Sequence, residues 1–230
     1  MKKSFFADKV ILVEGISDRL IFQRLIEKYH KSETIIEVLE VHGKSNLIKY
    51  RYFLKLFKIK NYIVADLDYV TDIGDSNIKN MFDVDNINIE DGVLFNKKSK
   101  DGKTLMALVR EIIDKVEKGE KIEDVDTIVS LNNFLEYIES RYRKLKDGLS
   151  ERDKQLLYEF VDSKRSESIF ILKYGEIEDY FPEISKNRSL ESIVEFITTE
   201  KLDKWYKEAE KDDMRKDLEL IISNIMNDEK

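Results

Sequence analysis

The stretch of sequence that decides the fold is KVILVEGISD, residues 9–18. Residues 9–13 form a short apolar run that stops at Glu14 and Gly15, and this pattern is typical of a buried parallel β-strand that ends at a functional edge. After it, apolar residues recur at helical spacing up to about Tyr29. The sequence therefore predicts a strand that is followed at once by a helix.

Further strand and helix patterns follow along the chain. Residues 35–41 (IIEVLEV) and 62–65 (YIVA) predict strands, and residues 47–57 predict a helix between them. Strand and helix units in a row indicate an α/β fold with a small parallel sheet covered by helices. The carboxyl ends of these strands bring Glu14, Gly43 and Asp66 to one edge of the sheet, where open α/β folds bind their ligands.

The remainder of the chain changes character. Residues 70–165 carry turn signals and long amphipathic stretches, around residues 105–117, 122–132 and 133–145, and predict a mainly helical insertion. A strand pattern returns at residues 168–172 (SIFIL), and residues 190–226 predict a helical C-terminus. We therefore expect a core of residues 1–69 and 166–230, interrupted by an insertion of residues 70–165.

Composition restricts the chemistry. The chain has no cysteine and its histidines are His30 and His42, so a metal would be bound by oxygen ligands, which favours Mg²⁺, Mn²⁺ or Ca²⁺ over zinc. The formal charge of −7 is unusual for a protein that holds nucleic acid by bulk electrostatics, but it allows a local basic groove. No apolar stretch has the length of a membrane span, and no signal peptide is visible, so we expect a soluble cytoplasmic protein without a membrane partner.

Acidic residues gather at the predicted sheet edge. Asp18 lies one helical turn after Glu14, and Asp66 and Asp68 point to the same side of an extended backbone. A divalent cation would offset their mutual repulsion. Taken singly, Glu14 and Asp18 can be helix-start acids, and Asp66 and Asp68 can be turn formers. Their joint placement at one edge favours a metal site.

The acidic motifs resemble a known family. Residues 13–18 (VEGISD) and 65–68 (ADLD) look like the paired motifs of Toprim domains, and the similarity is closest to the OLD (overcoming lysogenization defect) nucleases. Residues 42–44 (HGK) resemble that family's glycine-lysine turn, and residues 172–180 (LKYGEIEDY) resemble its late lysine-glycine-glutamate motif. The resemblance spans residues 5–181 outside the insertion, and it implies a Toprim fold of the Rossmann-like type.

The resemblance also implies roles for single residues. It implies a nuclease that cleaves DNA phosphodiesters with one or two Mg²⁺ or Mn²⁺ ions, for which Ca²⁺ would be a poorly productive substitute. The implied metal ligands are Glu14, Asp18, Asp66, Asp68, Glu176 and Glu178. Glu14 and Asp66 would be essential for catalysis, and Lys173 or Lys44 would stabilise charge on the reacting phosphate. A solvated lysine at a strand end is the alternative for Lys173.

Basic residues that could contact nucleic acid are Lys44, Arg51 and Lys55. Lys44 belongs to the glycine-lysine turn. Arg51 and Lys55 alternate with aromatic residues on the predicted helix of residues 47–57, a pattern that suits phosphate contacts but that an amphipathic helix also shows. These residues therefore remain candidates for a DNA-binding surface.

Other functions stay open at this stage. A non-catalytic Toprim module that binds metal and nucleic acid with a partner is the main alternative, and a strand-passing or primer-synthesising enzyme is the third. OLD proteins usually carry an ATPase domain and resemble antiphage defence components, whereas this sequence has no phosphate-binding loop of the ATPase type. We therefore expect either a C-terminal region of such a nuclease or a free-standing relative, with an ATPase domain or subunit as a candidate partner.

Overall fold

The computed structural model describes residues 2–29, 34–85, 114–115, 117–119, 143–208 and 212–228. The chain divides into two compact units, one formed by Met1–Ile73 with Glu151–Lys230 and the other by Gly74–Ser150. The division falls after Ile73 and after Ser150, whereas the sequence pattern placed it after residues 69 and 165. Helix α8 (Glu151–Lys164) packs on strand β6 (Ile169–Ile171), so it belongs to the first unit.

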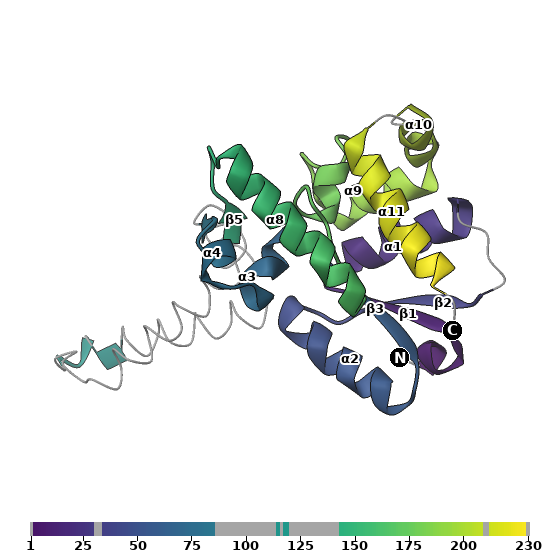
Figure 1. Ribbon diagram of the computed structural model, residues 1–230, viewed down its shortest axis with the longest axis horizontal. Coiled ribbons are helices and arrows are strands. Elements are labelled where there is room, and N and C mark those ends of the chain that lie inside the picture. The colour runs from purple at the N-terminus through teal and green to yellow at the C-terminus, as the bar shows by residue number, and fades with distance from the viewer. Residues whose placement is uncertain are drawn as a thin grey trace. The chain divides into compact units, whose positions relative to one another are not determined.

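The first unit is built on a four-stranded parallel sheet in the order β2-β1-β3-β6 (Figure 1). Its strands are β1 (Lys9–Val13), β2 (Ile36–Glu40), β3 (Lys60–Ala65) and β6, and every pair is parallel. Strands β1 and β3 are buried along nearly their whole length, as the continuous apolar runs in the sequence predict. The structure is thus an α/β fold consistent with the Rossmann-like Toprim architecture.

Helices cover both faces of this sheet. Helices α1 (Ile16–Tyr29), α9 (Leu190–Thr198) and α11 (Asp213–Asn227) lie on one face, and α2 (Leu47–Leu56) lies on the other (Figure 1). Helix α10 (Lys201–Glu208) packs against α9. Alternate residues of β1 and β3, such as Ile11 and Val64, join the apolar core beneath α1, α9 and α11. The C-terminal part of the chain is therefore helical, as predicted.

Short helices connect these elements. Turns of 3₁₀ helix occur at Lys2–Phe6, Lys44–Asn46, Leu67–Tyr69, Arg165–Glu167 and Ile177–Tyr180, and a short α3 spans Val70–Ile73. No helix in the described part of the chain combines the length and the apolar character needed to cross a bilayer.

The C-terminal helix is attached to the first strand by a buried lysine. The Lys9 ammonium donates hydrogen bonds to the carbonyl oxygens of Ile225 (2.8 Å) and Met226 (2.9 Å) in the last turn of α11. Burial lowers the pKa of Lys9. Its charge sits where carbonyls at a helix end have no helical partner, so this contact fixes α11 on the sheet.

The second unit contains α4 (Ser76–Lys79) and an antiparallel pair formed by β4 (Phe82–Val84) and β5 (Arg143–Leu145). The sequence prediction of a helix through residues 133–145 is wrong at its end, because Arg143–Leu145 pairs with β4. Residues 114, 115 and 117 are helical as expected, and the other residues of the predicted insertion helices lie outside the described part.

A buried carboxylate on α11 holds the loop that follows β6. Asp217 accepts hydrogen bonds from the Tyr180 hydroxyl (2.7 Å) and from the Lys173 backbone N–H (3.2 Å). Its side chain is 4% exposed, and Arg165 lies 3.5 Å from it. Because Lys173 and Tyr180 stand at the two ends of one loop, a single carboxylate fixes both ends.

Tyr180→Phe should lower the free energy of unfolding by about 1–3 kcal/mol, because Asp217 would lose a buried hydrogen-bond donor. Denaturant unfolding followed by circular dichroism measures the loss. Tyr174→Phe is the matched control, because the Tyr174 hydroxyl makes no hydrogen bond to the described residues. Equal stability of the wild type and Tyr180→Phe would show that the contact does not fix the loop.

Candidate metal centre

Neighbouring strands deliver their acidic segments to the same edge of the sheet. Glu14 follows β1 and Asp66 follows β3, and these strands are hydrogen-bonded neighbours. Backbone hydrogen bonds connect the segments beyond the strands. The Gly43 N–H donates to the Glu14 carbonyl (3.1 Å), and the Leu67 N–H donates to the Gly175 carbonyl (3.0 Å). The loop that carries Glu176 is thereby attached to the segment that carries Asp66.

The acids at this edge act on one another. Burial raises the pKa of Asp66 well above its ordinary value. The carboxylates that raise it further are those of Asp18, Glu176, Glu14 and Asp68. Burial also raises the pKa of Asp18 to about 7, with added repulsion from Glu178 and Glu14. The acidic residues that the sequence singled out therefore share one electrostatic environment, which we call the acidic edge.

Several carboxylates of the acidic edge already have partners. The Lys44 ammonium lies 2.8 Å from Asp68 Oδ2 and is 7% exposed. Asp18 Oδ2 accepts the Gly15 backbone N–H at 2.9 Å, which fixes Asp18 at the start of α1. Glu14 also has a partner within the protein. Lys44 therefore neutralises part of the local negative charge.

Glu176 lies at the rim of the same edge. Burial raises its pKa to about 7, the Arg188 charge lowers it, and Glu178, Asp179 and Asp68 raise it. Arg188 forms ion pairs with Glu176 and with Asp179, the latter at 2.6 Å. Glu176 and Asp179 also form a capping box around the short helix Ile177–Tyr180. The loop thus holds its acids in a defined conformation.

Asp66 provides the clearest sign that a cation fits. Its Oδ1 atom is buried and accepts no hydrogen bond. A buried carboxylate oxygen without a partner is costly, and a hard cation bound by carboxylate oxygens would satisfy it. No three Asp, Glu or His side chains in the described ranges already surround a common position.

The predicted basic residues Lys173, Arg51 and Lys55 lie beside groups other than the carboxylates of the acidic edge. The Lys173 ammonium is paired with Asp162 of α8 at 2.8 Å and lies over the Tyr158 ring. Arg51 and Lys55 line a cavity beside Lys60 and Asn61, at the amino end of β3. They are therefore at the sheet edge opposite to the acids, because Asp66 follows the carboxyl end of the same strand.

Sequence reasoning missed three residues that shape the edge. The spacing of Glu176 and Asp179 is that of a capping box, so Asp179 could have been recognised. Arg188 and Asp217 carry no such signal. They reach the loop from positions 12 and 37 residues away in sequence from their partners.

The fold is consistent with that of a Toprim domain. Residues 5–68 match the family model described as Overcoming lysogenization defect protein-like, TOPRIM domain. The match spans β1 through Asp68 and confirms the resemblance for that part of the chain. Searches among curated proteins and among solved structures gave no match. Toprim domains generally bind divalent metals such as Mg²⁺, and a nuclease-type Toprim module implies contact with nucleic acid.

Without metal, the Asp18→Asn variant should gain stability relative to the wild type as the pH rises from about 5 to about 8. Folded Asp18 keeps its proton up to about pH 7, whereas an unfolded aspartate releases its proton near pH 4. The folded wild type binds more protons in this interval, so its free energy of unfolding falls with rising pH. Asparagine removes this dependence and can still accept the Gly15 N–H.

Thermal unfolding in EDTA at several pH values measures the difference in Tm between variant and wild type. Glu183→Gln is the control, because Glu183 is an exposed acid outside the acidic edge. A Tm difference that stays constant with pH would contradict the raised pKa of Asp18.

Proposed function

We propose that the acidic edge binds Mg²⁺ or Mn²⁺ and that the protein hydrolyses phosphodiester bonds of DNA. The buried, unpartnered Asp66 Oδ1, surrounded by other carboxylates that raise the pKa of Asp66, is the observation that carries this proposal. Its place in the segment that matches the OLD-like TOPRIM domain supports it. The donor set is made of carboxylates, which suits hard divalent cations.

We assign the cation-binding role to the acids that meet at the edge. Glu14, Asp66 and Asp68 lie nearest to the strand ends and would hold one ion, with Asp18 as a further ligand directly or through water. Glu176 and Glu178, on the loop after β6, would contribute to a second position. Bound ions would supply an activated water and neutralise the leaving oxygen, and Ca²⁺ would serve less well.

The lysines near the edge take different roles in this proposal. Lys44 is buried against Asp68, so it keeps that carboxylate in place and offsets its charge while no ion is bound. Lys173 remains the candidate for stabilising charge on the reacting phosphate. To do so its ammonium would have to exchange Asp162 for a phosphate oxygen, since the two are paired here.

A second candidate function is a Toprim module that binds metal and nucleic acid without cutting. The observation that favours it is that two groups assigned to the reaction are already in ion pairs, Asp68 with Lys44 and Lys173 with Asp162. An ATPase domain or subunit as partner and a role in antiphage defence follow from the resemblance, and we keep both as proposals.

Asp66→Ala and Glu14→Ala should each reduce cleavage of supercoiled plasmid in Mg²⁺ or Mn²⁺ to the level of an EDTA control. Each change removes a ligand for the cation. Stabilisation of the fold by added Mg²⁺ should shrink in the same variants, because ligand-induced stabilisation follows binding. The Tm without metal should stay the same or rise slightly, since the substitution relieves repulsion between carboxylates.

Glu183→Ala is the control for cleavage, because this exposed acid lies outside the acidic edge. Cleavage that survives both substitutions would place the active site elsewhere. A wild type that binds Mn²⁺ and DNA but never cuts would support the non-catalytic function.

A further inference from the structure

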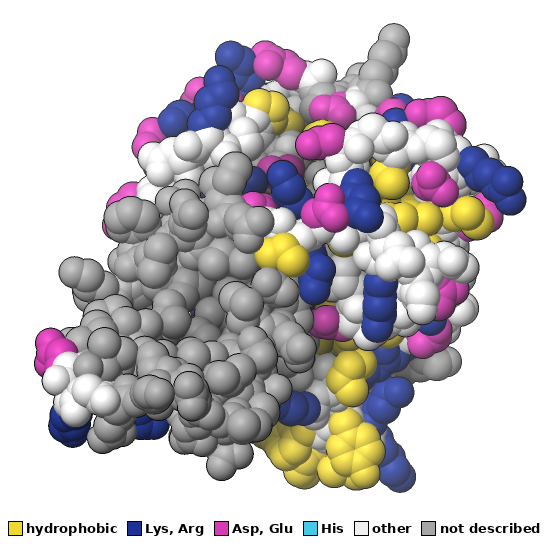
Figure 2. Space-filling view, turned by 90° about the vertical axis from the view of Figure 1, so that its left-hand side faces the viewer, with side chains coloured by type: hydrophobic (Ala, Val, Ile, Leu, Met, Phe, Trp, Pro, Cys, Tyr) yellow, Lys and Arg dark blue, Asp and Glu magenta, His cyan; other side chains and the backbone are white. Residues whose placement is uncertain are grey.

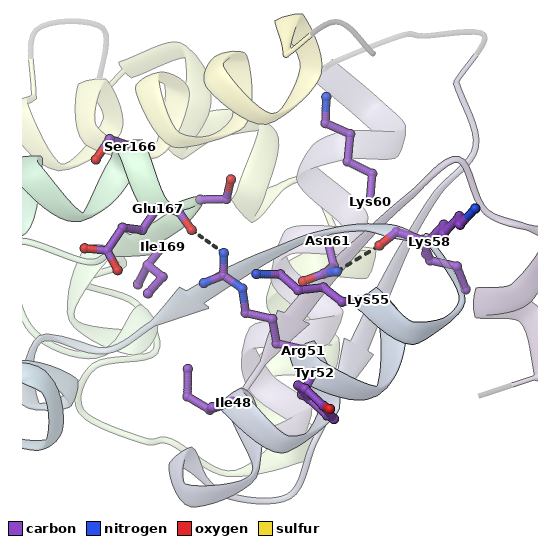
Figure 3. Close-up of a pocket in the computed structure, with 12 residues that line it drawn as sticks. Ile48, Arg51, Tyr52, Lys55, Lys58, Lys60, Asn61, Ser166, Glu167 and Ile169 are labelled. Carbon is purple, nitrogen blue, oxygen red and sulfur yellow. Dashed lines mark hydrogen bonds between the residues drawn. The ribbon is translucent and has the colours of Figure 1, made fainter.

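A second feature of the first unit lies at the sheet edge opposite to the acids. A cavity of about 750 Å³ is bordered by α2, by the start of β3 and by the segment before β6 (Figure 3). Asn61 lines it near the amino end of β3, and Asp66 follows the other end of that strand. Five residues of strand correspond to roughly 16 Å, so the cavity is separate from the acidic edge. We call it the α2 cavity.

The α2 cavity is lined by more cationic than anionic side chains. Arg51 and Lys55 are four residues apart on α2, and Figure 3 shows both reaching toward the start of β6. Like charges at this spacing destabilise a helix unless an anion lies near them. Lys55 and Lys58 form no side-chain hydrogen bond or ion pair with described residues. Lys60, by contrast, is paired with Asp228 at 3.1 Å.

Two buried polar atoms at the cavity also lack partners. Arg51 donates one hydrogen bond to the Glu167 carbonyl, but its Nε–H has no acceptor. Asn61 Oδ1 has no donor, while Asn61 Nδ2 donates to the Ile59 carbonyl at 2.8 Å. Both atoms are closed to solvent, so they belong to the incompletely paired wall of the cavity and are not themselves contacts for a ligand that enters it.

One acid lines the cavity, but its charge is already compensated. The Glu167 carboxylate lies 2.7 Å from the Lys164 ammonium, and this contact lowers the pKa of Glu167. Glu167 presents its backbone carbonyl to Arg51. The net charge of the side chains that line the cavity is therefore positive, which favours an anionic ligand.

The rim of the cavity adds an aromatic surface. Tyr52 is 67% exposed and Ile48 is 50% exposed, and both line the cavity. Figure 2 shows hydrophobic and basic side chains gathered together at the lower end of the molecule, at the height of α2 in Figure 1. An exposed aromatic ring beside guanidinium and ammonium groups is the combination that binds a base and its phosphate.

We infer that the α2 cavity binds a phosphorylated nucleoside, with Arg51 and Lys55 on the phosphate and Tyr52 against the base. The nucleoside is either a free nucleotide or one residue of a nucleic-acid strand, since both present this chemistry. Binding at the α2 cavity needs neither metal nor cleavage, so its test is independent of the proposed nuclease activity.

Binding of AMP and of a short 5′-phosphorylated single-stranded DNA should be measured by calorimetry in EDTA at low salt. The Lys55→Gln and Arg51→Gln variants should each weaken binding about tenfold or more, because each removes a charge-assisted hydrogen bond. Lys55 is exposed and unpartnered, so its substitution leaves the fold intact. Lys49→Gln is the matched control, a lysine on the same helix that does not line the cavity.

The two probes distinguish the source of the ligand. Loss of AMP binding in the variants supports a free nucleotide, and loss of oligonucleotide binding alone supports a strand. Tyr52→Ala should weaken AMP binding while leaving the weaker binding of inorganic phosphate unchanged. The inference is overturned if neither probe binds the wild type at millimolar concentration, or if Lys49→Gln weakens binding as much as Lys55→Gln does.

Discussion

The repulsion among carboxylates at one sheet edge is the constraint on which the rest of the structure depends. Buried strands β1 and β3 fix the backbone before Glu14 and Asp66, so these acids cannot move apart without loss of core packing. Burial then makes each charge costly and raises the pKa of Asp66 and Asp18. A divalent cation bound at this edge would remove the free-energy cost of burying these carboxylates.

Neighbouring donors and cations partly offset the negative charge of these carboxylates while no metal is bound. Lys44 forms an ion pair with Asp68, and Arg188 forms one with Glu176. The Gly15 N–H donates a hydrogen bond to Asp18. On the far side of the loop, Asp217 anchors Tyr180 and so holds the acids of residues 172–180 in reach of Asp66. The acidic edge is therefore supported from α1, the glycine-lysine turn, the loop after β6 and the C-terminal helix together.

Much of this arrangement can be read from the sequence. The uninterrupted apolar runs at residues 9–13 and 62–65 decide the buried strands, and the acids that follow them decide the edge. Arg51 and Lys55 were predicted, together with Lys44, as contacts for nucleic acid, although Lys44 lies in the turn before the helix that carries the other two. A helix of ten residues rises about 15 Å, however, and it carries Arg51 and Lys55 to the opposite edge of the sheet. The strand at Arg143–Leu145 was missed because its pairing with β4 joins residues far apart in sequence.

The central claim is that the acidic edge binds divalent cations, and anomalous diffraction from crystals soaked in Mn²⁺ tests it most directly. The account predicts anomalous density within about 2.0–2.6 Å of carboxylate oxygens of Asp66 and Glu14. It also predicts that the Lys44 ammonium withdraws from Asp68 when the ion binds. Manganese density only at other surface acids, with Asp66 Oδ1 still unpartnered, would contradict the claim.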